Sequence, residues 1–282
     1  MPDFDEYLNN FIDSAIREDV GDGDHSSLSC IPADARGRAQ LIVKEDGIIA
    51  GIDVAQKVFS KLAPDVKFEK LISDGTHVHK GDIAFRVECT TRTLLLAERL
   101  VLNIMQHMSG IATATNVYVR RLEGLHTKVL DTRKTTPGMR LLDKLAVKIG
   151  GGVNHRIGLF DMIMLKDNHN DFAGGIQQAI RRAQEYLKAN NKKLKIEVEV
   201  RNLDELAQVM AVGGVDRIML DNFDLATTRK AVEIIGGRYE TESSGGITLD
   251  TLRDYAECGV DFISVGALTH HVSSLDMSLK AY

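Results

Sequence analysis

Residues 194–223 read LKIEVEVRNLDELAQVMAVGGVDRIMLDNF, and this stretch decides the fold. Its runs KIEVEV (195–200) and DRIML (216–220) are typical of buried strands, and the segment between them has the apolar spacing of a helix. Two strands joined by a helix predict a parallel pair, because parallel strands need a crossover connection. The stretch therefore predicts an α/β fold.

The same alternation of apolar runs and helical segments extends over the chain beyond Gly110. The other strand-like runs are KVLD (128–131), DMIML (161–165), RYETE (238–242) and DFISV (261–265), and Gly151–His155 is a candidate further strand. No Gly-x-Gly-x-x-Gly turn follows the first run. This favours a (β/α) barrel, complete or incomplete, over a doubly wound sheet.

The chain before Gly110 has a different pattern. Residues 3–19 place apolar side chains on one helical stripe, and short strand-like runs with tight turns between Gly37 and Thr91 predict an antiparallel sheet. Residues 93–110 are apolar nearly all round, which indicates a helix buried between layers or at an interface. A charge on such a helix, such as Arg99, needs a partner.

Composition excludes several classes of protein. The 282 residues have a formal net charge of −5, whereas nucleic acid and anionic membranes require a broad basic face. There is no apolar run long enough to span a bilayer, and the first residues are acidic where a leader is basic, so we expect a cytoplasmic protein. We interpret the widely spaced Cys30, Cys89 and Cys258 as packed, reduced thiols.

Polar residues close almost every strand-like run, at the end where parallel α/β folds bind ligands. The cationic ones are Arg133, Lys134 and Lys166, together with His155 and Arg156 after a glycine-rich turn. An arginine–lysine pair is often only a solvated loop, but here the turn Thr135–Gly138 holds it. Arginine binds carboxylate or phosphate through two hydrogen bonds, and lysine acts as a point charge. The cluster predicts a substrate with several negative charges.

Acidic and glycine-rich strand ends complete the edge. Glu199 and Asp221 are equally compatible with ion pairs to the lysines and with Mg²⁺, which uses one or two carboxylates beside substrate phosphates. The segment Ser244-Gly245-Gly246 and, one strand later, Gly266 predict a site for a phosphate monoester, with a helix beginning near Thr248–Asp250. We interpret His77 and His79, which have no third ligand nearby, as surface residues. His270 and His271 lack metal-site spacing, and we interpret Asp22–Ser27 as a turn.

The motifs VLDTRKTTPGMR, GGGVNHRIGLFDMIMLKDNH, IEVEV, IMLDNF, ESSGGIT and ISVGALT, with AERLVLNIMQHMSGIAT upstream, closely resemble the quinolinate phosphoribosyltransferase family. The resemblance spans nearly the whole chain. It implies an N-terminal α/β sandwich (1–110, with 272–282 returning to it) and an open, incomplete α/β barrel (111–271) of about seven strands, of the type II phosphoribosyltransferase kind. The implied reaction joins quinolinate and phosphoribosyl pyrophosphate to give nicotinate mononucleotide, pyrophosphate and CO₂.

The resemblance also implies a role for each site residue. Arg133, His155 and Arg156 would hold the quinolinate carboxylates, joined by Arg99 from the partner subunit of a homodimer or of a larger assembly of dimers. Lys134 and Lys166 would bind pyrophosphate, and Glu199 and Asp221 would face the ribose hydroxyls and Mg²⁺. The 5′-phosphate would lie on Ser244, Gly245, Gly246 and Gly266.

Two other functions have to be weighed against this one. Lys166 closes a barrel strand, as the lysine of a Schiff-base aldolase does. The other is a non-catalytic relative that binds a phosphorylated ligand or serves metal-cofactor uptake, and the retention of every basic residue and both acids argues against it.

Overall fold

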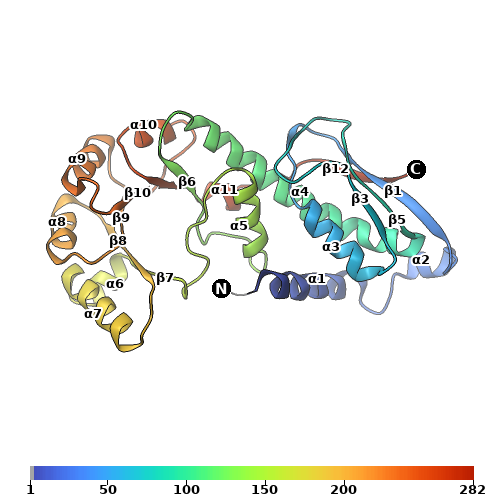
Figure 1. Cartoon of the computed structure of the whole chain (residues 1–282), viewed down its shortest axis with the longest axis horizontal. Coiled ribbons are helices and arrows are strands. Elements are labelled where there is room, and N and C mark those ends of the chain that lie inside the picture. The colour runs from blue at the N-terminus through green and yellow to red at the C-terminus, as the bar shows by residue number, and fades with distance from the viewer. Residues whose placement is uncertain (1–2) are drawn as a thin grey trace. The chain divides into compact units, whose positions relative to one another are not determined.

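The computed structural model describes residues 3–282, which form two compact units (Figure 1). The first consists of the described residues up to Asn116 with Thr135–Gly151 and Leu268–Tyr282, and the second of Val117–Lys134 and Gly152–Ala267. The first two residues of the predicted N-terminal domain lie outside the described part. A domain boundary at residue 110 stays a prediction.

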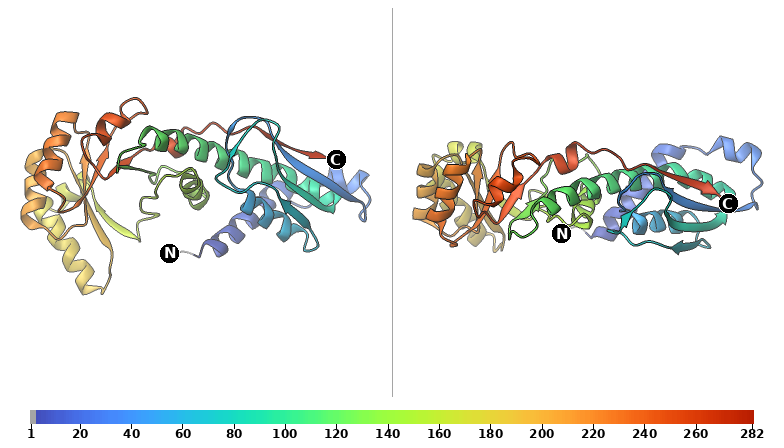
Figure 2. Two further views of the ribbon diagram at one scale, coloured as in Figure 1. Left: turned by 45° about the horizontal axis from the view of Figure 1, so that its top comes forward. Right: turned by 90° about the horizontal axis from the view of Figure 1, so that it is seen from above.

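The first unit is built on a four-stranded antiparallel sheet of order β12-β1-β5-β3, as predicted for this part of the chain. Its strands are β1 (Arg36–Val43), β3 (Lys67–Lys70), β5 (Ile83–Thr90) and β12 (Met277–Ala281). The last strand of the chain pairs with β1, as Figure 2 shows. Buried side chains alternate with more exposed ones along β1, so one face of the sheet packs on the core.

Helices complete this unit. They are α1 (Phe4–Val20), α2 (His25–Cys30), α3 (Ile52–Leu62), α4 (Thr91–Arg121), α5 (Arg140–Ile149) and α11 (Ala267–His270), and the short strands β2 (Gly47–Ile48) and β4 (His77–Val78) form a separate pair. The N-terminal helix is confirmed. Phe59 of α3 packs edge-on against Phe85 of β5, with 6.3 Å between ring centroids, so α3 lies against the sheet.

The long helix α4 is buried on one side only. Leu102, Met105 and Met108 are buried, whereas Leu95 and Arg99 are exposed within the chain. Burial between layers is therefore confirmed for one face of the helix, and burial of the other face at an interface stays a prediction. None of the helices within residues 3–282 is both long and apolar enough to cross a membrane.

The second unit is built on a six-stranded parallel sheet of order β6-β11-β10-β9-β8-β7. Its strands are β6 (Lys128–Leu130), β7 (Met162–Leu165), β8 (Lys195–Val200), β9 (Arg217–Asp221), β10 (Glu240–Ser244) and β11 (Phe262–Ser264). The connecting helices are α6 (Asp167–Phe172), α7 (Ile176–Ala189), α8 (Leu203–Val212), α9 (Leu225–Ile235) and α10 (Leu252–Ala256), and α7 to α10 lie in an arc outside the strands (Figure 1).

The sheet curls into an open barrel. The first strand, β6, pairs with the last, β11, and on its other side Leu130 forms a single parallel bridge to Val153. Among the described residues no strand pairs with the outer side of β7, so the barrel stays open there. This confirms the incomplete α/β barrel, and the candidate strand at Gly151–His155 is reduced to that one bridge. Glycines at 150–152 and Asn154 favour a turn over a longer strand.

One predicted strand is displaced. RYETE (238–242) was expected, but β10 spans Glu240–Ser244. Gly236 and Gly237 both have positive φ, and the amide of Arg238 bonds back to the carbonyl of Ile235, so Arg238 still belongs to the turn. The shift includes Ser243 and Ser244 in the strand.

The cysteine prediction is only partly right. Cys89 and Cys258 are buried, but Cys30 is exposed because it ends the short helix α2. His77 and His79 are exposed, as predicted. The turn predicted for Asp22–Ser27 is right only for its first residues, because Asp24 accepts a hydrogen bond from the amide of Ser27 and caps α2, which begins at His25.

Candidate active site

The parallel strands of the second unit place the predicted site residues at one edge of one sheet. Arg133 and Lys134 follow β6, Lys166 follows β7, Glu199 stands next to the end of β8, Asp221 ends β9, Ser244 ends β10, and Gly266 follows β11. Since all these strands run in the same direction, their carboxyl ends share an edge. Cations, carboxylates and glycine turns therefore meet there.

Two guanidinium groups lie close together at this edge. Arg156 is only 9% exposed, and its Nη1 donates to the carbonyl of Met162 at 3.1 Å. Burial lowers the pKa of Arg156, and the positive charge of the exposed Arg133 lowers it further. A bound anion relieves both effects, so this pair is suited to a carboxylate or phosphate.

The ring of His155 lies against buried carboxylates. Its Nε2 is 3.1 Å from Glu197 Oε2 and 3.4 Å from Glu242 Oε2, while its Nδ1 accepts from the amide of Arg156 at 2.6 Å. Burial by itself lowers the pKa of His155, but the two carboxylates outweigh it and raise that pKa to about 9. The amide contact favours the neutral ring and the carboxylates favour the imidazolium. In both forms the proton that faces the carboxylates is on Nε2.

Sequence reasoning missed the other members of this cluster, Glu197, Arg217 and Glu242. Arg217 Nη1 lies 3.0 Å from Glu242 Oε2 and 3.8 Å from Glu197 Oε2, and all three side chains are buried. The signal was present, because alternate residues of a strand share a face: Glu197 lies two positions before Glu199, and Glu242 two before Ser244. These three residues lie beneath the strand ends, so they are not found when only the strand ends are considered.

The acids Glu199 and Asp221 have different partners. Glu199 Oε2 is 3.0 Å from Lys166 Nζ, so the ion-pair interpretation is confirmed for this residue. Asp221 accepts instead from the side-chain amide of Asn222 at 2.8 Å. Because this partner is a neutral amide, a divalent cation could supply the opposite charge to the half-buried Asp221 carboxylate.

The glycine turn after β10 requires its first glycine. Gly245 has φ +97°, and a Cβ there would lie 2.2 Å from Asn222 Oδ1. The amide of Asn222 donates to the carbonyl of Ser244 at 2.9 Å, which locks the turns after β9 and β10 together. The helix expected from Thr248–Asp250 begins only at Leu252, because Thr248 and Thr251 form a turn first. With five residues, α10 offers little helix dipole.

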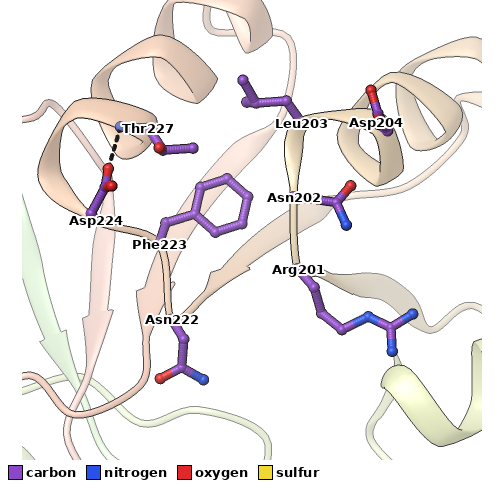
Figure 3. Close-up of a pocket in the computed structure, with 8 residues that line it drawn as sticks. All are labelled: Arg201, Asn202, Leu203, Asp204, Asn222, Phe223, Asp224 and Thr227. Carbon is purple, nitrogen blue, oxygen red and sulfur yellow. Dashed lines mark hydrogen bonds between the residues drawn. The ribbon is translucent and has the colours of Figure 1, made fainter.

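A cavity of about 400 Å³ lies between the loops after β8 and β9. Its lining residues are Arg201, Asn202, Leu203, Asp204, Asn222, Phe223, Asp224 and Thr227, and Figure 3 shows the Phe223 ring between the two loops. Asn202 and Asp224 cap α8 and α9, and Arg201 is paired with Glu205 at 2.6 Å. These polar groups are occupied by the fold itself.

Arg99 is not part of this edge. It lies on α4 in the first unit and is exposed. Within residues 3–282 it makes no hydrogen bond or ion pair. The partner that its charge was expected to need is therefore not found in the described chain.

The open parallel barrel and this edge define an α/β-barrel enzyme that acts on an anionic small molecule. Models of the quinolinate phosphoribosyl transferase N-terminal and C-terminal domains match residues 24–109 and 111–280. The chain belongs to the quinolinate phosphoribosyltransferase family, which confirms the resemblance seen in its motifs.

Individual relatives are also similar to this chain over most of their own length. The chloroplastic nicotinate-nucleotide pyrophosphorylase (carboxylating) of Oryza sativa subsp. japonica is 47% identical over 97% of this chain and 77% of its own length. The probable enzyme of that name from Bacillus subtilis is 41% identical, over 96% and 92%. The crystal structure of NadC from Streptococcus pyogenes superposes with a TM-score of 0.92 at 38% identity, over 100% of this chain and 99% of that one.

Proposed function

We propose that the chain is a decarboxylating quinolinate phosphoribosyltransferase of NAD biosynthesis, which converts quinolinate and phosphoribosyl pyrophosphate to nicotinate mononucleotide, pyrophosphate and CO₂. The observation that best supports this is the pair Arg133 and Arg156 beside the Lys166–Glu199 ion pair on one sheet edge. A dicarboxylate suits the first group and a charged phosphosugar the second.

We assign the roles by charge and position. Arg133 and Arg156 bind the two carboxylates of quinolinate, with His155 beside them, and Lys134 and Lys166 bind pyrophosphate. Glu199 and Asp221 face the ribose hydroxyls. The 5′-phosphate lies on the turns after the last two strands, at Ser244, Gly245, Gly246 and Gly266.

The chemistry depends on fixed charge. The pyridine nitrogen of quinolinate attacks the anomeric carbon as the bond to pyrophosphate breaks, and this nitrogen has no proton to lose, so no general base is needed. Lys134 and Lys166 stabilise the oxygens of the leaving group as they gain charge. The positive charge on the alkylated ring nitrogen then stabilises the electron pair that stays on the adjacent carbon when CO₂ departs.

The carbon that loses CO₂ must gain a proton, and the structure favours Lys166 over His155 as its source. Lys166 Nζ lies at the strand edge with a side chain 46% exposed, whereas both ring nitrogens of His155 face protein groups. His155 has no comparable route to the substrate.

Mg²⁺ fits the acids at this edge. Asp221, with its neutral amide partner, would hold it together with Glu199 and the substrate pyrophosphate. When bound, the ion supplies positive charge to the departing oxygens.

The direct test is to incubate the protein with quinolinate, phosphoribosyl pyrophosphate and Mg²⁺ and to follow the mononucleotide and CO₂. We expect both products in equal amounts, and no reaction when Mg²⁺ is chelated. Absence of product with quinolinate, and with nicotinate as an alternative acceptor, would overturn the proposal.

The aldolase alternative is disfavoured. A Schiff-base lysine must be neutral to attack a carbonyl, and such lysines are desolvated or placed beside another cation. Lys166 is instead half-exposed, and its Nζ lies 3.0 Å from a carboxylate, that of Glu199. Borohydride trapping with carbonyl substrates should give no adduct.

Replacing Gly245 with alanine is expected to raise the KM for phosphoribosyl pyrophosphate on the order of tenfold or more, because the new Cβ displaces Asn222 and deforms the phosphate turn. Steady-state kinetics on both substrates would measure this. Gly237→Ala is the matched control, since that glycine also has positive φ but lies after α9 with open space around it. Equal effects of the two changes would show that the turn at Gly245 does not bind the phosphate.

We also propose a homodimer, with Arg99 of each subunit entering the site of the other. An exposed arginine beside the exposed Leu95 on α4 supports this arrangement. A cytoplasmic location stays a prediction.

A further inference from the structure

Beneath the strand ends lies a buried cluster of charged side chains, of which the proposed function uses only His155. Its members are His155, Glu197 of β8, Arg217 of β9 and Glu242 of β10. Glu197 pairs in register with Arg217, and both carboxylates have fully buried side chains. Buried charge is costly, and replacing such groups by apolar residues is often neutral for stability. A structural role in the core alone is therefore a weak reason for the cluster.

A metal ion does not explain the cluster. His155, Glu197 and Glu242 have the residue types of a metal site, with ligand atoms within 4.8 Å of one another. However, Arg217 Nη1 lies 3.0 Å from one carboxylate and 3.8 Å from the other. The guanidinium already supplies the positive charge that an ion would bring, and it would repel a second cation at that distance.

The contacts of His155 show what the carboxylates hold. Glu197 and Glu242 face Nε2, at 3.1 and 3.4 Å. On the opposite side of the ring Nδ1 accepts from the amide of Arg156, and the amide of His155 itself donates to Asp131 at 2.8 Å. The ring is thus clamped between two strands and the backbone of the residue that grips the substrate.

We propose that Glu197 and Glu242 are positioning residues of the dicarboxylate site, which hold the His155 ring by Nε2 so that the ring fixes the backbone of Arg156. His155 then acts through Arg156 instead of donating a proton to the substrate. The inference rests on the proposed function, since it presumes that Arg156 binds quinolinate.

The charges of the cluster support this arrangement. Burial and then Glu242 raise the pKa of Glu197 to about 7. Burial acts in the same direction on Glu242, but His155 and Arg217 outweigh it and lower its pKa. Glu242 also lies closer to Arg217, at 3.0 Å against 3.8 Å for Glu197, so its loss should matter more than that of Glu197.

The sharpest comparison is between two glutamates of the same strand. Glu240 and Glu242 both contact Arg217 through Oε2, at 3.1 and 3.0 Å, but only Glu242 also reaches His155. Glu242→Gln is expected to raise the KM for quinolinate on the order of tenfold to a hundredfold, with the KM for phosphoribosyl pyrophosphate little changed. Glu240→Gln should leave both values near those of the wild type. Equal effects of the two changes, or an equal rise for both substrates, would overturn the proposal.

Two further measurements keep the inference testable if Glu242→Gln folds poorly. Glu197→Gln should fold better than Glu242→Gln. The rise in the KM for quinolinate caused by His155→Gln should not increase further when Glu197→Gln is added, because both changes act through the same contact. Additive losses would contradict the proposal.

NMR of ¹⁵N-labelled histidine separates this inference from the proposed function. We expect Nε2 of His155 to carry a proton in the wild type, with a resonance that shifts in Glu197→Gln and not in Glu240→Gln. This readout needs no activity. An inactive wild type with the expected resonance would overturn only the proposed function, and an active wild type with unprotonated Nε2 only the inference.

Discussion

Replacing Arg156 with lysine is expected to lower kcat/KM for quinolinate on the order of a hundredfold, because a lost hydrogen bond to a charged group typically costs about 1.5–3 kcal/mol. Lysine keeps the charge but loses the planar fork that binds a carboxylate through two hydrogen bonds. It also loses the bond from Nη1 to the Met162 carbonyl that orients the group. Steady-state kinetics with quinolinate as the varied substrate would measure the change.

Arg201→Lys provides the matched control for this prediction. Arg201 follows the neighbouring strand β8 and lines the cavity of Figure 3, but it is exposed and paired with Glu205 and Asp171. We expect kinetics near those of the wild type. If Arg156→Lys kept the wild-type KM, the dicarboxylate would have to bind elsewhere on the edge.

The barrel was predictable because its strands have strong local signals. β8 and β9 are largely apolar runs separated by a helix with a clear stripe, and an acidic residue stands next to the end of β8 and at the end of β9. Where the local signal is ambiguous, the predicted start of a strand is wrong by a few residues. Arg238 has the pattern of a strand residue but belongs to the turn at Gly236 and Gly237. Pairing of β6 with β11 joins residues more than a hundred positions apart, and no local pattern contains that information.

The candidate residues at the strand ends could be predicted from the sequence, whereas the buried charged residues beneath them could not. Arg133, Lys166 and Asp221 could be found because they follow strands, and parallel strands share one edge. Glu197 and Glu242 were missed because a charge inside an apolar run reads as a solvent-facing position. Only the tertiary contact with Arg217 and His155 shows that these charges face inward.

Mixing the inactive variants Arg99→Ala and Arg133→Ala is expected to restore about a quarter of the wild-type activity, if the protein is a two-fold dimer with shared sites. In a mixed dimer the chain that lost Arg99 keeps Arg133 and receives Arg99 from its partner, so that site is complete. The other site lacks both residues. Half of randomly formed dimers are mixed, and each of these has one working site of two.

The measurement requires co-expression with two affinity tags, so that mixed dimers are purified as such, and these purified dimers should have about half of the wild-type activity instead of the quarter expected of the unpurified mixture. The matched control mixes Arg133→Ala with Arg156→Ala. Both residues lie in the second unit, on the same sheet edge, so each chain damages its own site and no mixed dimer has a complete one. Recovery with the first pair and none with the second would assign Arg99 to the partner's site. Without recovery in either, Arg99 acts within its own chain or not at all, and its exposure on α4 would need another explanation.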